Sequence, residues 1–271
     1  MKTRIVVAAV GIPLLLIVLL VLPAMATALL IAAMSVVAAY ELLWRTGLVK
    51  NIVLVGVSAL MALTVSLWCS SDMSWTAALI GLWIYLMVLV CLMIASHAKL
   101  PFGEVCISVF SGLVFPLLIS ALTRIRVMDY GRYYILIPLV LCFGTDSAAY
   151  FVGCAIGRHK MAPVISPKKS WEGAAGGALG GIVLMFLYSL VLDLAFGFEV
   201  KYGACILYGI LGAGVCIIGD LAFSVIKRQT GIKDYGELLP GHGGILDRFD
   251  SMTFVAPMTE ALLLILPLIS K

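Results

Sequence analysis

The sequence predicts an all-α, polytopic integral membrane protein with about nine transmembrane helices and a cytoplasmic N-terminus. Two observations support this fold class: 63% of the 271 residues are hydrophobic and only 12% are charged, and the mean hydropathy is +1.16. Soluble proteins carry about 25% charged residues, so most of this surface cannot face water. The composition therefore excludes a soluble enzyme, a disordered chain and a disulfide-stapled secreted domain.

Apolar segments bounded by Pro, Gly or charged residues mark the expected helices, because a membrane-spanning helix needs about 20 such residues. In chain order they are residues 5–22, 24–43, 51–69, 75–96, 104–122, 133–156, 171–195, 202–226 and 252–269. The first is similar to a signal peptide, with Lys2 and Arg4 ahead of its apolar run. It is longer than the roughly 7–15 apolar residues of a signal peptide, so we expect it to be retained as a span.

Basic residues set the expected orientation. With the N-terminus inside, nine spans place most of the 18 Lys and Arg residues in the cytoplasm, as the positive-inside rule requires. The exceptions are Arg124, Arg126, Arg132, Lys201 and Lys271, and a re-entrant piece at 123–132 would reverse the topology that follows. We therefore interpret the modest net positive charge as Lys and Arg residues that orient the protein in the membrane, and not as a nucleic-acid-binding surface.

The two halves of the chain differ in character. Residues 1–140 are expected to form N-terminal transmembrane helices with short loops. Residues 141–271 are expected to form a C-terminal catalytic region with two polar cytoplasmic loops, 157–170 and 227–251, within one structural domain overall. The absence of an internal repeat weakens a transporter reading, since many transporters carry repeated halves.

Asp146 and a lysine pair are the first candidate functional residues. Asp146 interrupts the sixth apolar segment, where an ionised carboxylate costs at least about 2.5–3.5 kcal/mol unless it is paired or hydrated. Lys168 and Lys169 precede the seventh segment, where N–H groups at a helix start would help to bind an anion. The alternatives are an assembly ion pair for Asp146 and contact with lipid headgroups for the lysines.

Glycines recur every four residues in the seventh segment. They are Gly173, Gly177 and Gly181, together with Gly176 and Gly180. Small residues at this spacing predict close packing against a neighbouring helix and not a phosphate-binding loop.

The end of the eighth segment carries a polar face. Asp220, Ser224, Lys227 and Arg228 stand at i, i+4, i+7 and i+8, so a metal and a phosphate could share one side of a helix. The alternative is that Asp220 simply pairs with Lys227 or Ser224.

The polar run from Lys233 to Asp250 is the most informative part of the chain. Pro and Gly residues around His242 predict a tight turn, and Asp247 and Asp250 would then share one face of a following helix. Carboxylates with few thiols suit a hard cation such as Mg²⁺. The alternatives are that Asp250 caps a helix and that Arg248 pairs with Asp247 or with a lipid phosphate. Glu41, Asp193, Glu199 and Glu260 have no motif around them and are interpreted as helix-end or interface residues.

The pattern from Ser224 to Asp250 resembles the signature of the phosphatidate cytidylyltransferase family. It comprises Ser224-Val225-Ile226-Lys227-Arg228, then Lys233-Asp234, then Pro240-Gly241-His242-Gly243-Gly244-Ile245-Leu246-Asp247-Arg248-Phe249-Asp250. The segments around Asp146 and from Ser166 to Glu172 also resemble that family, so the likeness covers roughly residues 140–256. The first half is similar only in its hydropathy.

The resemblance implies cytidylyl transfer from CTP to phosphatidic acid, giving CDP-diacylglycerol and pyrophosphate with Mg²⁺, and it leaves a second cation open. It implies that Asp220 and Asp247 hold the metal, with Asp146, Asp234 and Asp250 as further candidates. Other implied catalytic residues are Lys227, Arg248 and His242, the last to orient a phosphate or carry a proton. Residues implied to bind CTP or lipid phosphate are Ser166, Lys168, Lys169, Ser170, Ser224, Arg228, Lys233, Gly243 and Gly244.

The expected setting is the bacterial cytoplasmic (inner) membrane, with the site facing the cytoplasm and a membrane lipid as partner. Glycine-faced helices and the resemblance are both compatible with a homodimer. Two other functions stay open: a cation-coupled transporter in which Asp146 and Asp220 bind the coupling ion, and a CTP-dependent transferase or kinase acting on an isoprenoid lipid. The last would need a base for its neutral hydroxyl.

Overall fold

A computed structural model describes residues 2–69, 74–97, 99–238 and 243–269. The chain divides into two compact units. The first comprises Met1–Val127 and Thr230–Arg248, and the second comprises Met128–Gln229 and Phe249–Lys271. The predicted catalytic loop 227–251 therefore contributes mostly to the first unit, although it follows a helix of the second.

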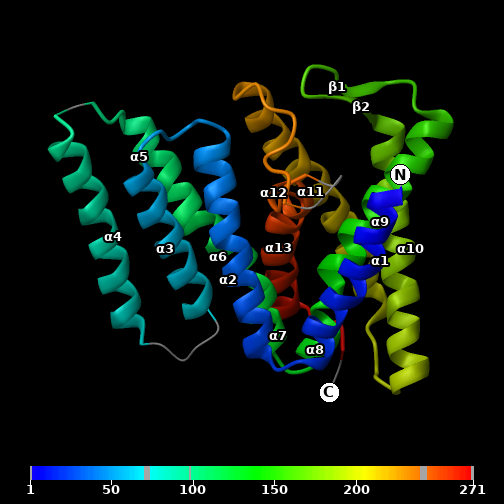
Figure 1. The fold of residues 1–271 in the computed structure, drawn as a ribbon. Helices are drawn as coiled ribbons and strands as arrows, with labels where there is room; N and C mark the ends of the chain where they lie inside the picture. Colours follow the sequence, from blue (N-terminus) through cyan, green and yellow to red (C-terminus); the bar gives the residue numbers. More distant parts are fainter. Residues whose placement is uncertain (1, 70–73, 98, 239–242, 270–271) are drawn as a thin grey trace. The chain divides into compact units, whose positions relative to one another are not determined.

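The first unit is a bundle of helices, several of which continue through short π-helical segments (Figure 1). Its elements are α1 (Lys2–Leu16), η1 (Ile17–Val21), α2 (Ala24–Tyr40), η2 (Glu41–Arg45), α3 (Ile52–Trp68), α4 (Trp75–Ala95), α5 (Phe102–Val109), η3 (Phe110–Val114), α6 (Phe115–Ile119) and α7 (Ala121–Val127). Polar caps start two of them: the Asn51 side chain accepts from the N–H of Val53 at 3.0 Å, and Ser74 Oγ accepts from that of Ala77 at 3.2 Å. These side chains satisfy N–H groups that have no partner within the helix.

Arg126, which the predicted topology leaves outside the cytoplasm, has a structural role. It is only 8% exposed, and it donates from Nε to the carbonyl of Leu19 at 2.8 Å and from Nη2 to that of Leu22 at 3.1 Å. Carbonyls at a helix end lack partners within the helix. Arg126 therefore ties the end of η1 to α7, which is a structural use of its charge.

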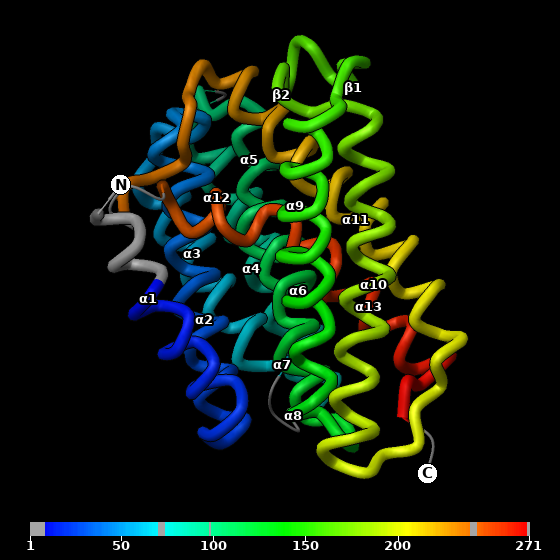
Figure 2. Tube along the Cα trace, turned by 90° about the vertical axis from the view of Figure 1, so that its right-hand side faces the viewer, coloured from blue at the N-terminus to red at the C-terminus, as the bar shows by residue number. Residues whose placement is uncertain are grey.

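The second unit contains α8 (Gly131–Tyr134), α9 (Leu136–Ile156), β1 (Lys160–Ala162), β2 (Ser166–Ser170), α10 (Trp171–Phe196), α11 (Tyr202–Gln229) and α13 (Met252–Ile265), while the short α12 (Leu246–Phe249) crosses the boundary between the units. Figure 2 shows α9, α10 and α11 side by side, with the β1–β2 hairpin where α9 ends and α10 begins.

A short hairpin in the loop 157–170 of the second unit is a local feature that the all-α prediction did not include. The strands are antiparallel, with Lys160 opposite Ser170 and Ala162 opposite Ser166. They are three and five residues long, and Pro163 and Pro167 interrupt the segment. Strands this short show no clear alternation of polar and apolar residues, so the sequence pattern did not reveal them.

The glycines of α10 confirm the predicted close packing. A Cβ on Gly177 would lie 3.1 Å from the carbonyl oxygen of Thr145 on α9. On the α11 side, a Cβ on Gly209 would lie 2.6 Å from the backbone nitrogen of Ile182. The absence of side chains lets three backbones approach closely, as in other membrane helix bundles.

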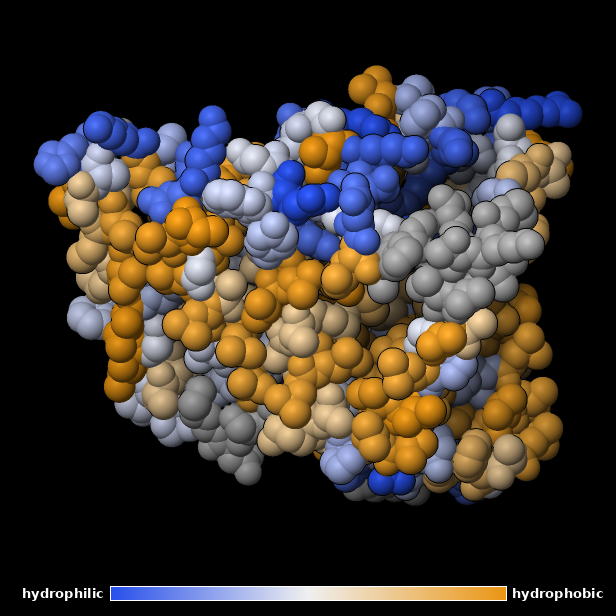
Figure 3. Space-filling model, viewed as in Figure 1, coloured by the Kyte–Doolittle hydropathy of each residue, from blue (hydrophilic) through white to orange (hydrophobic). Residues whose placement is uncertain are grey.

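Six helical stretches among the described residues are long and apolar enough to cross a bilayer: Ala24–Arg45, Trp75–Ala95, Phe102–Val127, Gly131–Ile156, Trp171–Phe196 and Tyr202–Gln229. Shorter apolar helices, Ala9–Val21, Ile52–Trp68 and Met252–Ile265, occupy the first, third and ninth predicted spans. The count of nine spans therefore stays a prediction. In the first unit, Figure 3 shows a largely hydrophobic surface along α4, with hydrophilic residues gathered where α4 leads into α5.

Candidate active site

A cavity of about 270 Å³ in the second unit gathers many of the predicted site residues. Its walls come from α9, the hairpin, α10 and α11. Predicted residues that line it are Asp146, Ser166, Lys168, Lys169, Ser170 and Asp220. Two carboxylates and two ammonium groups in one cavity suit a ligand that carries phosphates together with a cation.

Asp220 is the best-connected carboxylate of this cavity. Its Oδ2 lies 2.5 Å from Lys169 Nζ, and both side chains are partly exposed, at 29% and 23%. Ser224 Oγ donates to Asp220 Oδ1 at 3.2 Å, one turn along α11. The pairing with Ser224, which the sequence offered as an alternative, is present, whereas the pairing with Lys169 was not predicted. An ion pair with this much solvent contact contributes only about 0–1 kcal/mol to stability. Asp220 can therefore leave Lys169 for another partner at a small cost in free energy.

Two further carboxylates lie near Asp220. Asp146 is exposed and accepts a long contact from Cys216 Sγ, at 3.5 Å. Asp250 accepts from the N–H of Ser251 at 2.7 Å. Burial, followed by the charges of Asp220 and Asp146, raises the pKa of Asp250 to about 7, although Lys227 opposes this. The three carboxylates therefore share one electrostatic environment.

The donor set fits a hard cation. Within the described ranges, no three His, Cys, Asp or Glu side chains form a complete metal-binding group. Mg²⁺ is usually held through one or two carboxylates, with substrate phosphates and water completing its shell. Asp220 with Asp146 or Asp250 supplies such a partial set of oxygen ligands, and the cavity contains no cysteine that would select a soft metal.

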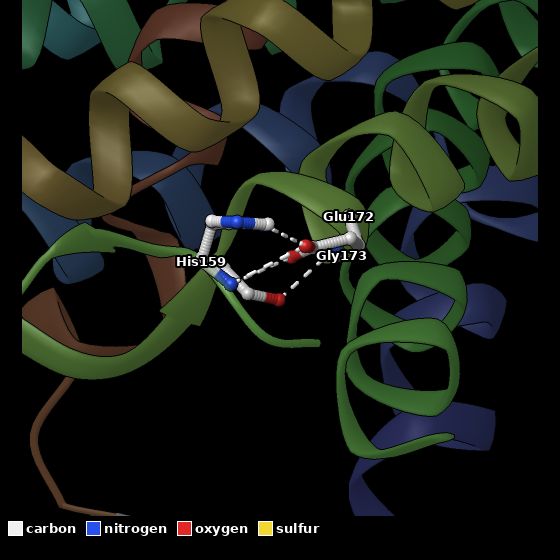
Figure 4. Close-up of polar contacts among 4 residues, drawn as sticks. His159, Glu172 and Gly173 are labelled. Atoms are coloured by element: carbon white, nitrogen blue, oxygen red, sulfur yellow. Dashed lines mark hydrogen bonds and ion pairs between the residues drawn. The ribbon is translucent and has the colours of Figure 1, made fainter. Parts of the chain in front are cut away.

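The hairpin that carries Lys168 and Lys169 is anchored next to the start of α10. His159 Nδ1 lies 2.6 Å from Glu172 Oε1, and the His159 N–H donates to both carboxylate oxygens at 3.2 Å (Figure 4). Ser170 Oγ accepts from the Gly173 N–H at 3.1 Å and so caps α10. The capping bond gives Ser170 a structural role beside its predicted binding role.

Arg228 secures the opposite side of the hairpin. Its Nε donates to the carbonyl of Ile165 at 3.0 Å, between the two strands. Arg228 was expected to clamp a phosphate, and here it holds the loop on which the lysines stand. Lys168 is exposed in that loop, where its ammonium can reach a soluble ligand.

The signature segment of the first unit is folded around Asp247. This residue is 8% exposed, and its Oδ2 accepts from the N–H groups of Tyr235 at 2.7 Å and Gly244 at 3.0 Å. Gly243 has a φ of +87°, a conformation that glycine adopts without strain. Asp247 therefore closes the segment into a turn through its two backbone N–H donors.

Glu41 is the residue that sequence reasoning underestimated. It is 2% exposed, and it accepts from the N–H groups of Ile245 at 3.0 Å and Leu246 at 2.9 Å. These partners are 204 and 205 positions away in sequence. The criterion applied to Asp146, a carboxylate inside an apolar segment, would also have selected Glu41.

The remaining predicted residues divide between the units. Lys233, Asp234 and Arg248 are exposed in the first unit, and Lys227 is half-buried in the second. His242 lies outside the described residues, so its catalytic role stays a prediction.

Known proteins with similar sequences were found for most of the chain. The cytidylyltransferase family matches residues 2–266. The phosphatidate cytidylyltransferase of Bacillus subtilis is 36% identical over 240 residues, which cover 86% of this chain and 87% of that protein. The enzyme of the same name from Haemophilus influenzae is 36% identical over 145 residues, covering 51% of this chain and 50% of that protein. That from Staphylococcus epidermidis is 42% identical over 134 residues, covering 49% and 50%.

The match thus spans about half the length of the Haemophilus and Staphylococcus relatives and most of the Bacillus relative. The family match alone covers far more than half of the chain. The chain therefore belongs to the cytidylyltransferase family.

Proposed function

We propose that this protein transfers the cytidylyl group of CTP to phosphatidic acid and produces CDP-diacylglycerol and pyrophosphate. The observation that carries the proposal is the cavity of the second unit, where Asp220 and Asp146 lie with Lys168 and Lys169. Relatives named phosphatidate cytidylyltransferase support the choice of reaction and substrates. A cation-coupled transporter gains no support from the same comparisons.

The chemistry requires mainly positioning and charge neutralisation. A phosphate oxygen of phosphatidic acid attacks the α-phosphorus of CTP, a bond from that phosphorus to oxygen forms, and the bond to the pyrophosphate oxygen breaks. The attacking phosphate is already anionic at neutral pH, so no strong base is needed. Preorganised cations and N–H donors lower such barriers by stabilising the charge that builds up on the phosphates.

Asp220 is the residue we propose as the main ligand of Mg²⁺, with Asp146 and Asp250 as supporting carboxylates of the same unit. Asp247 stays the second metal ligand that the signature implies. When bound, the cation would neutralise negative charge on the nucleotide phosphates and on the leaving pyrophosphate. Lys169 forms an ion pair with Asp220. We propose that its ammonium moves to a phosphate on binding, which releases Asp220 for the metal.

Lys168 and Ser166 complete the proposed phosphate-binding side of the cavity. Lys227, Lys233 and Arg248 are proposed to attract the CTP and lipid phosphates as cations. We further propose that the cavity faces the cytoplasm from the inner membrane of a bacterium, because CTP is water-soluble and phosphatidic acid is held in the inner leaflet.

The test is turnover by the purified protein in detergent with labelled CTP, phosphatidic acid and Mg²⁺, with EDTA as control. Label should enter lipid only when metal and phosphatidic acid are present. Asp220→Asn should abolish turnover, because an amide cannot replace the anionic ligand. Asp193→Asn is the matched control: Asp193 lies at the far end of α10 and accepts from Tyr202 Oη at 2.6 Å, which an amide oxygen can also do. Label in an isoprenoid alcohol but not in phosphatidic acid would favour the related transferase or kinase.

A further inference from the structure

Glu41 is an acidic side chain enclosed in the first unit, at the start of the π-helical segment η2. Its two oxygens accept from consecutive backbone N–H groups, Oε1 from Ile245 and Oε2 from Leu246. Leu246 is the first residue of α12 and Ile245 directly precedes it; N–H groups at a helix start have no acceptors within the helix. Glu41 thus caps a helix start from a distant part of the chain.

The segment around it is shaped to admit this carboxylate. A Cβ on Gly236 or on Gly244 would collide with Glu41 Oε1. Gly236 is not in the left-handed region, so its need for glycine comes from this close approach and not from backbone conformation. Both glycines lie in the segment that carries the signature, so two glycines of this loop are explained by their contact with Glu41, the first residue of η2.

The contacts of Glu41 lie immediately beside those of Asp247. Leu246 directly precedes Asp247, while Asp247 itself accepts from the N–H groups of Tyr235 and Gly244. Two carboxylates therefore receive four backbone N–H groups of one segment. Removing the acceptor at Leu246 would free the backbone on which Asp247 stands.

We propose that Glu41 is a positioning residue for the cytidylyltransferase reaction, because it fixes the backbone turn that presents Asp247 and Arg248. This inference rests on the proposed function, in which those two residues serve the metal and the phosphates. Glu41 makes no contact with substrate in this role. This role requires a hydrogen-bond acceptor at both side-chain oxygens of Glu41. Glutamine cannot replace it, because one of the two positions becomes an NH₂ donor.

The first test compares Glu41→Gln with a control, Glu104→Gln. Glu104 lies in α5 of the same unit, and its carboxylate accepts only a long, exposed contact from the Lys50 N–H at 3.4 Å. In Glu41→Gln an amide N–H would face a backbone N–H, so one charge-assisted hydrogen bond is replaced by repulsion. Loss of one hydrogen bond to a charged group corresponds to a decrease of about 10- to 150-fold in the measured constant. We expect kcat/KM for CTP to fall in that range, with a smaller change in the KM for phosphatidic acid and with normal activity in Glu104→Gln.

The second test approaches the same contact from the loop. Gly236→Ala should displace the Glu41 carboxylate and reproduce the loss for CTP. If both changes act through one contact, the double variant should be no more impaired than the worse single variant. If the loss of kcat/KM in the double variant were the product of the two single losses, the proposal would be overturned. Wild-type kinetics in either single variant would also overturn it. Should Glu41→Gln fail to fold, Gly236→Ala alone decides by the same kinetic criterion.

Turnover by the unmodified protein separates an error in the proposed function from an error in the role of Glu41. If the unmodified protein does not label phosphatidic acid from CTP, the reaction itself is wrong. If it does, and the KM values for CTP and lipid rise by the same factor in Glu41→Gln, then Glu41 supports the fold generally and not the turn at Asp247.

Discussion

Substitution of Gly209 by alanine tests whether backbone proximity of α10 and α11 builds the cavity. A Cβ at this position would lie 2.6 Å from both the backbone nitrogen and the Cα of Ile182. Carbon atoms reach their optimal separation at about 3.5–4.0 Å. The helices must therefore move apart by roughly 1 Å, because the obstructing atoms are backbone and cannot rotate away.

The expected cost follows from this displacement. Overpacking of a well-packed core costs about 1–3 kcal/mol, and a backbone obstacle points to the upper part of that range. Asp220 lies eleven residues farther along α11, about 16 Å by the helical rise, while Lys169 lies two residues before α10. Ser170 links Lys169 to the start of α10, so a shift of the two helices should lengthen the 2.5 Å contact between Lys169 and Asp220 and lower activity as well as stability.

The assay is thermal unfolding of the purified protein in detergent, together with turnover of CTP. Gly214→Ala is the matched control, since Gly214 lies in the same helix and a Cβ there would meet nothing within 4 Å. We expect Gly209→Ala to melt several degrees lower and Gly214→Ala to be unchanged or slightly stabilised, because alanine favours helix over glycine. Equal stability of the two variants would refute the account of close packing in the second unit.

Three other predictions concern the proposed site. Lys168→Ala should raise the KM for CTP more than the KM for lipid in steady-state assays. An unchanged KM for CTP would mean that Lys168 only contacts lipid headgroups on the cytoplasmic side. Asp247→Asn should lose turnover while the protein still inserts and purifies, and retained activity would contradict its assignment to the metal. Protease added to oriented vesicles should cut the loop 227–251 only from the cytoplasmic face, and cleavage from the other side would overturn the predicted topology.

Local sequence patterns predicted the features that depend on neighbours along the chain. The apolar segments located the helices, and helical spacing placed Ser224 beside Asp220, where the structure has them hydrogen-bonded. The four-residue glycine repeat predicted the close approach of α10 to α9. Each of these follows from the period of an α-helix and the size of one side chain.

Contacts between distant segments could not be predicted in the same way. Lys169 and Asp220 stand in different elements, and Glu41 meets Leu246 from 205 positions away. A single sequence carries no signal for which of several acidic residues will receive a particular N–H group. The hairpin was missed for a different reason, since its strands are too short to show a period.

The most direct test of the central claim is the fate of the individual phosphates of CTP. The purified protein should be incubated with phosphatidic acid, Mg²⁺ and CTP labelled at either the α- or the γ-phosphate. Cytidylyl transfer predicts that the α-label appears in CDP-diacylglycerol and the γ-label in pyrophosphate, in equal amounts. Lipid that carries the γ-label, with CDP left in solution, would show a kinase and contradict the account.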